Sequence, residues 1–147
     1  MKNSALYAIS VGYILLYTVL ILASGVWLFL LSQGLGSASG LLDTLKDIIA
    51  LPEEKSLRGL IEVATPHLFA MGALIFVVAH FMLFSTTVSK KHALFVALIV
   101  FGLALFDIFS YFAISFGWVV SGWLKLTALF AFVSSFMVLL TLVAFSL

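Results

Sequence analysis

The sequence predicts an all-α integral membrane protein: a four-helix bundle with a short interfacial amphipathic helix between the first and second spans. The 147 residues are 65% hydrophobic and 9% charged, whereas a soluble domain is about half apolar and a quarter charged. The mean hydropathy is +1.33. Four segments are longer than the roughly 20 residues that a helix needs to cross a hydrocarbon core of about 30 Å. Long, uniformly apolar runs favour helices over the short alternating strands of a barrel.

These segments define one expected transmembrane domain, which covers residues 1–147. The expected spans are residues 5–31, 60–88, 92–117 and 119–147, and the long connection is the loop 32–59. The first span carries no charge. It is too long for the apolar core of a signal peptide, so we expect it to be retained in the membrane.

The loop 32–59 contains the signals for the interfacial helix. Glycine and serine residues between 34 and 40 end the first span. The stretch LLDTLKDIIALP, residues 41–52, then places leucine and isoleucine on one side and Asp43, Lys46 and Asp47 on the other, which predicts an amphipathic helix within residues 40–51. Pro52 is followed by two acids, Glu53 and Glu54, which predicts that the second spanning helix begins near Pro52.

Composition excludes several classes of function. The chain has no cysteine, which excludes disulfides, iron–sulfur clusters and thiol catalysis. A net charge of +1 is too small to indicate the strongly basic surface that binds nucleic acid. No phosphate-binding loop, G-x-S-x-G or H-E-x-x-H motif is present. The sequence therefore does not favour a stand-alone enzyme.

Basic residues are equally many on the two sides of the membrane, so their count does not decide the orientation. Lys2, Lys90 and Lys91 lie on one side of the membrane, and Lys46, Lys55 and Arg58 lie on the other. The compact turn that carries Lys90 and Lys91 favours a bacterial inner-membrane protein with both termini in the cytoplasm.

Ionisable residues at membrane depth are the candidates for function, because lipid penalises them. Asp107 precedes Phe116 by nine residues, and Lys125 follows it by nine. If the last two spans turn near Phe116, both residues lie about 13 Å from the turn, which predicts a structural ion pair. His67 is about 10 Å into the second span, in the same layer, and His80 is about 20 Å farther along the helix.

The two histidines lie in PHLFAMGALIFVVAHF, residues 66–81. This stretch resembles the histidine-bearing helices of transmembrane b-type cytochromes, in which paired histidines stack two haems across the bilayer. The spacing here is thirteen residues, whereas the cytochrome b helices of quinol oxidoreductases use about fourteen. The resemblance implies haem b with His67 and His80 as ligands to the iron, and Lys125 near a propionate.

Two bis-histidine haems need four histidines, so the resemblance also implies a homodimer or a larger membrane complex that donates the other ligands. The protein would then pass electrons between a quinone pool and a redox partner. Two alternatives stay open. One is a non-catalytic accessory subunit of a larger membrane complex. The other is a component for proton or ion transport that uses His67, Asp107 and Lys125.

Overall fold

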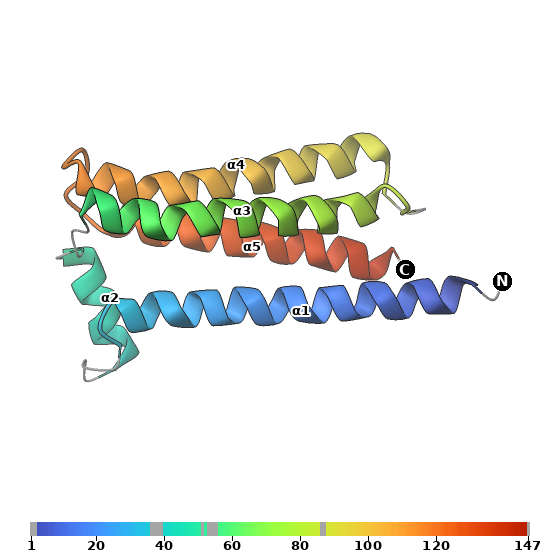
Figure 1. Ribbon diagram of the computed structural model, residues 1–147, viewed down its shortest axis with the longest axis horizontal. Helices are drawn as coiled ribbons and strands as arrows, with labels where there is room; N and C mark the ends of the chain where they lie inside the picture. The colour runs from blue at the N-terminus through green and yellow to red at the C-terminus, as the bar shows by residue number, and fades with distance from the viewer. Residues whose placement is uncertain (1–2, 36–39, 51, 53–55, 86–87, 147) are drawn as a thin grey trace.

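The computed structural model describes residues 3–35, 40–50, 52, 56–85 and 88–146. These residues form five helices: α1 (Asn3–Ser32), α2 (Leu41–Ala50), α3 (Leu57–Met82), α4 (Lys90–Ser115) and α5 (Trp123–Phe145). All but α2 are long and apolar enough to cross a membrane. They run alternately up and down, so both chain ends lie at the same end of the bundle (Figure 1). The predicted all-α bundle with a short helix between spans 1 and 2 is confirmed.

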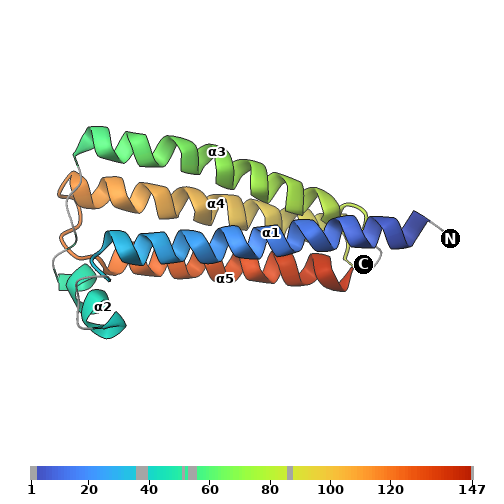
Figure 2. The same cartoon turned by 60° about the horizontal axis from the view of Figure 1, so that its bottom comes forward.

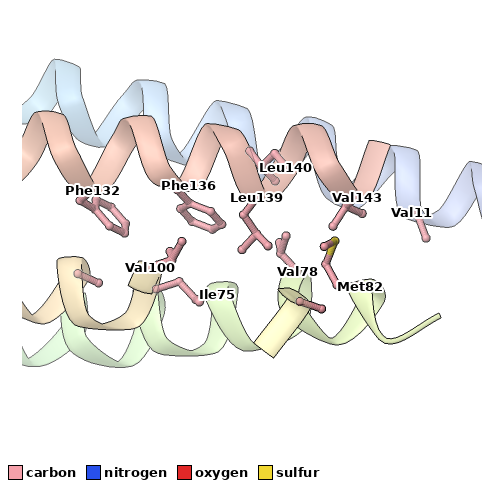
Figure 3. Packing of buried hydrophobic residues seen from close by; sticks show 12 residues of the cluster. Val11, Ile75, Val78, Met82, Val100, Phe132, Phe136, Leu139, Leu140 and Val143 are labelled. Atoms are coloured by element: carbon pink, nitrogen blue, oxygen red, sulfur yellow. The ribbon is translucent and has the colours of Figure 1, made fainter. Parts of the chain in front are cut away.

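Helices α3, α4 and α5 form the tightly packed part of the bundle. Phe132 and Phe136 of α5 are almost fully buried and point toward Ile75 of α3 and Val100 of α4 (Figure 3). Val78, Met82, Leu139 and Val143 extend this cluster toward the end of the bundle that holds the termini. Close packing of side chains stabilises helix association in lipid, where the solvent is as apolar as the helices themselves.

Helix α1 is attached less closely. Among its described side chains, Val11 and Thr18 are buried, and neither lies beyond the middle of the helix. Val11 joins the core cluster. Toward the end of the bundle that carries α2, the α1 and α3 ribbons lie farther apart (Figure 2).

Helix α2 lies at the end of the bundle (Figure 1). Thr44 and Ile48 are buried, whereas Leu41 and Leu42 are exposed. The Ile49 carbonyl accepts hydrogen bonds from Ser121 Oγ and from the backbone N–H of Gly122, both at 3.3 Å. These bonds satisfy a carbonyl that the end of a helix leaves without an internal partner. They fix α2 to the turn between α4 and α5.

The start of α3 corrects the sequence-based expectation. The helix begins at Leu57 rather than near Pro52, and Ser56 is its N-cap. The Ser56 hydroxyl accepts a hydrogen bond from the Gly59 N–H at 3.2 Å. A serine cap satisfies a backbone donor at the first turn, which a proline cannot do, and this decides the boundary. Glu53 and Glu54 lie outside the described residues.

Turns set the other boundaries. Helix α3 ends at Met82, before the end of the expected span at residue 88, and Ser89 then caps α4 by accepting from the His92 N–H at 3.4 Å. Helix α4 ends at Ser115, and Gly117 follows with a φ of 70°, a left-handed conformation that glycine adopts without strain. The turn therefore falls where the sequence placed it.

We predict that Gly122→Ala loosens the contact between α2 and the α4–α5 turn. A Cβ at this position would lie 1.8 Å from the Ile48 carbonyl oxygen and 2.8 Å from its carbonyl carbon. Both atoms belong to the backbone, so one of the two segments must move, at a cost of about 1–3 kcal/mol. Thermal unfolding in detergent measures the loss.

Gly102→Ala, in the middle of α4, is the matched control, because nothing lies within 4 Å of its Cβ position. There alanine has the higher helix propensity, by about 1 kcal/mol. Equal unfolding temperatures for the two variants would contradict the close approach.

Candidate ligand-binding cavity

A cavity of about 720 Å³ lies between the second half of α1 and the first half of α3. Its walls come from residues within 21–32 of α1 and within 60–77 of α3, and its floor comes from α4 and α5. The cavity lies toward the end of the bundle at which α1 and α3 are farther apart. Most of its lining is apolar, with Leu74, Phe132 and Phe136 as typical members.

An ion pair between α4 and α5 lies in the cavity floor. Lys125 Nζ is 2.6 Å from Asp107 Oδ1 and 2.9 Å from the Asp107 carbonyl oxygen. The two side chains are 7% and 5% exposed. The Ser110 hydroxyl donates a further hydrogen bond of 2.6 Å to the same carbonyl. This is the arrangement that equal spacing from the turn predicted.

Two aromatic rings surround the Lys125 ammonium. Its Nζ is 4.7 Å from the ring centroid of Tyr111 and 5.7 Å from that of Phe29, both within cation–π range. The two rings meet edge to face with centroids 6.3 Å apart. Gln33 Nε2 donates to the Tyr111 hydroxyl at 2.9 Å. Through Phe29 and Gln33, the end of α1 contacts the floor of the cavity.

His67 lies on the α3 wall of this cavity. Its Nδ1 is 2.9 Å from the carbonyl oxygen of Val63, one turn earlier. A carbonyl can only accept, so Nδ1 carries the hydrogen. In the neutral ring, Nε2 then has a lone pair that can accept a hydrogen bond or bind a metal. Thus His67, Asp107 and Lys125, which sequence counting assigned to one layer, all line one cavity.

His80 has different surroundings. Its side chain is exposed, as that of His67 is, but it does not line the cavity. Its ring stacks on Phe76 with centroids 6.0 Å apart and meets Phe84 edge-on at 5.5 Å. In the membrane this surface faces lipid or another chain. The structure therefore brings together His67, Asp107 and Lys125 and leaves His80 apart from them.

Sequence reasoning missed Tyr111 and Phe29, which line the cavity, and Gln33, which donates a hydrogen bond to Tyr111. Tyr111 was detectable, because it follows Asp107 by four residues and so lies on the same helix face. Phe29 and Gln33 give no local signal, since they reach the floor only through the placement of α1. Among the described residues, no group of three or more histidines and acids is arranged to hold a metal ion.

The bundle and its cavity define the class: an integral membrane protein built on four candidate spans. Within this class, residues 35–147 match the model of the Aq_1264_TM family, a transmembrane helical domain, and the chain belongs to this family. The match includes α2, α3, α4 and α5, whereas α1 precedes it. Searches of curated proteins and of solved structures found no significant match.

We predict that removing one partner of the buried ion pair destabilises the protein more than removing both. Asp107→Asn or Lys125→Met leaves a charge without compensation in the apolar interior, at a cost of about 3–5 kcal/mol. The double variant leaves no charge and should unfold at a higher temperature than either single variant. The unfolding temperatures of the two single variants and the double variant are compared in detergent.

Lys46→Met is the control, because Lys46 pairs with Asp43 at 3.5 Å on the exposed surface of α2. Such a pair contributes at most about 1 kcal/mol. A double variant that is no more stable than the single variants would contradict the role assigned to the buried pair.

Proposed function

We propose that the protein binds a long-chain lipid with a hydroxyl-bearing head, a quinol of the membrane pool, in the cavity between α1 and α3. It would do so as a subunit of a membrane electron-transfer complex. The shape of the cavity supports this proposal. Its α3 wall runs from Leu60 to Val77, about 25 Å along a helix, which matches an extended chain better than a compact solute.

Polar groups mark where the head of such a lipid would bind. His67, Tyr111 and the Asp107–Lys125 pair are all in the cavity lining, together with Ser32. Farther along α3 the lining is apolar, with Leu74 and Val77 opposite Ile21 and Leu22 of α1. The cavity therefore has a polar end and an apolar end, as an amphipathic lipid has.

One observation supports a lipid whose head bears a hydroxyl. The 2.9 Å contact between His67 Nδ1 and the Val63 carbonyl directs the lone pair of the neutral ring to Nε2. A hydroxyl donates to such a nitrogen, and the carbonyl of an oxidised quinone does not. His67 therefore suits the reduced quinol better than the oxidised quinone.

Haem b is the second candidate, and the same contact favours it. An imidazole that ligates a metal donates its other N–H to a carbonyl or carboxylate, as His67 Nδ1 does to Val63. Haem, when bound, supplies one-electron transfer. His67 fits as one ligand to the iron, with the second donated by another copy or subunit. His80 has ring neighbours and does not line this cavity, so a haem there would lie in a different place from one bound to His67.

The other two hypotheses draw on different features. An accessory role is favoured by the apolar outer face of α1, where Tyr13, Leu16, Tyr17 and Leu20 are all exposed. Transport has less support, because Asp107 and Lys125 are bonded to each other beneath a largely apolar cavity.

We predict that His67→Phe weakens binding of a decyl quinol to the purified protein about tenfold, the value of one hydrogen bond in an apolar site. His80→Phe is the matched control and leaves binding unchanged, since His80 does not line the cavity. Quenching of tryptophan fluorescence in detergent measures both affinities, and a reduced-minus-oxidised spectrum is recorded on each sample.

The spectrum separates the candidates. A haem signal that disappears in His67→Ala would replace the quinol proposal with the cytochrome proposal. A wild-type protein with neither haem nor quinol affinity would contradict both and leave the accessory role.

A further inference from the structure

We infer that the cavity exchanges its lipid sideways with the hydrocarbon core of the bilayer, through a slit between α1 and α3. This inference rests on the proposed function, because it assumes that a quinol occupies the cavity. It adds the route by which the quinol arrives and leaves, and it names Gly25 as a residue that keeps this route open.

Two rows of residues form the rims of the slit. A residue that lines the cavity and is also exposed at the surface lies at an edge of the cavity. The residues with both properties include Ile21, Gly25 and Leu28 of α1 and Val63, Ala70 and Val77 of α3. Leu28 and Val63 are 64% and 46% exposed, which side chains deep inside the bundle would not be. Each row recurs at intervals of three, four or seven residues and so follows one side of its helix. The slit therefore runs along the cavity.

Contacts close both ends of the cavity in the described part of the chain. Toward α2, the Gln33 amide donates to the Tyr111 hydroxyl at 2.9 Å and thereby joins α1 to α4. Leu60 of α3, which lines the cavity, is only 4% exposed. Toward the chain termini, Leu22 of α1 and Leu74 of α3 pack against the buried core cluster. The side between α1 and α3 is thus the opening that the described residues leave.

Gly25 lies where a larger side chain would narrow the slit. It belongs to the α1 rim, and nothing lies within 4 Å of the position that its Cβ would occupy. On the α3 rim, the side chain of Ala70 is a single methyl group. These two small residues leave space for a ring to pass without displacement of a large side chain.

The chemistry of a quinol suits a sideways route. Its tail is already dissolved in the hydrocarbon core, and its head has no charge, so the tail stays in apolar surroundings throughout the movement. Entry from water would instead take the whole tail out of the membrane, which costs free energy for every CH₂ group. His67 lines the same α3 wall, so the head reaches its hydrogen-bond acceptor without crossing the bundle.

The experiment compares the exchange of decyl quinol in the wild type, Gly25→Phe and Gly12→Phe. Gly12 is the matched control, because it is on the same helix, has nothing within 4 Å of its Cβ position and does not line the cavity. Stopped-flow quenching of tryptophan fluorescence in a nonionic detergent gives the association and release rates. We expect Gly25→Phe to slow both rates by the same factor, at least about tenfold, because an obstacle in the route raises the barrier in both directions. Gly12→Phe should exchange at the wild-type rates.

Cysteine cross-linking gives a second test if Gly25→Phe does not fold or does not bind. The natural chain has no cysteine, so Gly25→Cys combined with Ala70→Cys provides a unique pair of thiols. A reducible bifunctional thiol reagent bridges the pair after the quinol has bound, and mass spectrometry verifies the bridge. We expect the bridge to trap the quinol until a reductant opens it.

Four results would overturn the inference: a Gly25→Phe protein that exchanges as fast as the wild type, one in which only one of the two rates changes, a Gly12→Phe protein that is slowed equally, or a bridged protein that loses its quinol as fast as the unbridged one. A folded wild type that takes up no decyl quinol would contradict the proposed function itself. Uptake by the wild type together with any of the four results would contradict only the inference.

Discussion

The ion pair between Asp107 and Lys125 is the constraint on which the interior of this bundle depends. Removal of one charge would leave the other buried in largely apolar surroundings, which is unfavourable. The 2.6 Å contact therefore fixes the register of α4 against α5. Helices that are apolar on every side could slide by a turn at small cost, and a buried pair of opposite charges makes such a slide expensive. The same pair lines the cavity, so one interaction both joins two helices and places polar groups in the cavity floor.

The rest of the architecture divides into a firm part and a loosely attached part. Helices α3, α4 and α5 share the buried cluster around Phe132 and Phe136, and α2 is fixed to them by backbone hydrogen bonds at Ile49. The family match covers these four helices. Helix α1 joins through its first half and, at its far end, through the contacts of Phe29 and Gln33 with the floor. Between these attachments it diverges, and the space that results is the cavity.

The two membrane histidines show how one helix can carry the same residue in two environments. They are thirteen residues apart, about 140° around an ideal helix. His67 therefore lines the cavity while His80 lies among phenylalanine rings on the outer surface. A ligand for His67 can be held within this chain. His80 does not line this cavity, so the two histidines have different surroundings within a single copy.

The sequence by itself determined the four spans, the short helix between the first two, and the Asp107–Lys125 contact. The spans follow from run length, because lipid requires every backbone group to be bonded internally. The contact follows from a helical rise that is the same on both sides of a turn. The start of α3 was misplaced, because the serine cap at Ser56 outweighed the proline signal at Pro52. Only the tertiary structure decided which histidine lines the cavity, that Phe29 and Tyr111 lie beside Lys125, and that Gln33 bonds to Tyr111. Between His67 and His80 helix α3 has no polar side chain, so its pattern there does not fix its rotation about its own axis. Packing against α4 and α5 sets that rotation, and the divergence of α1 opens the space that His67 faces.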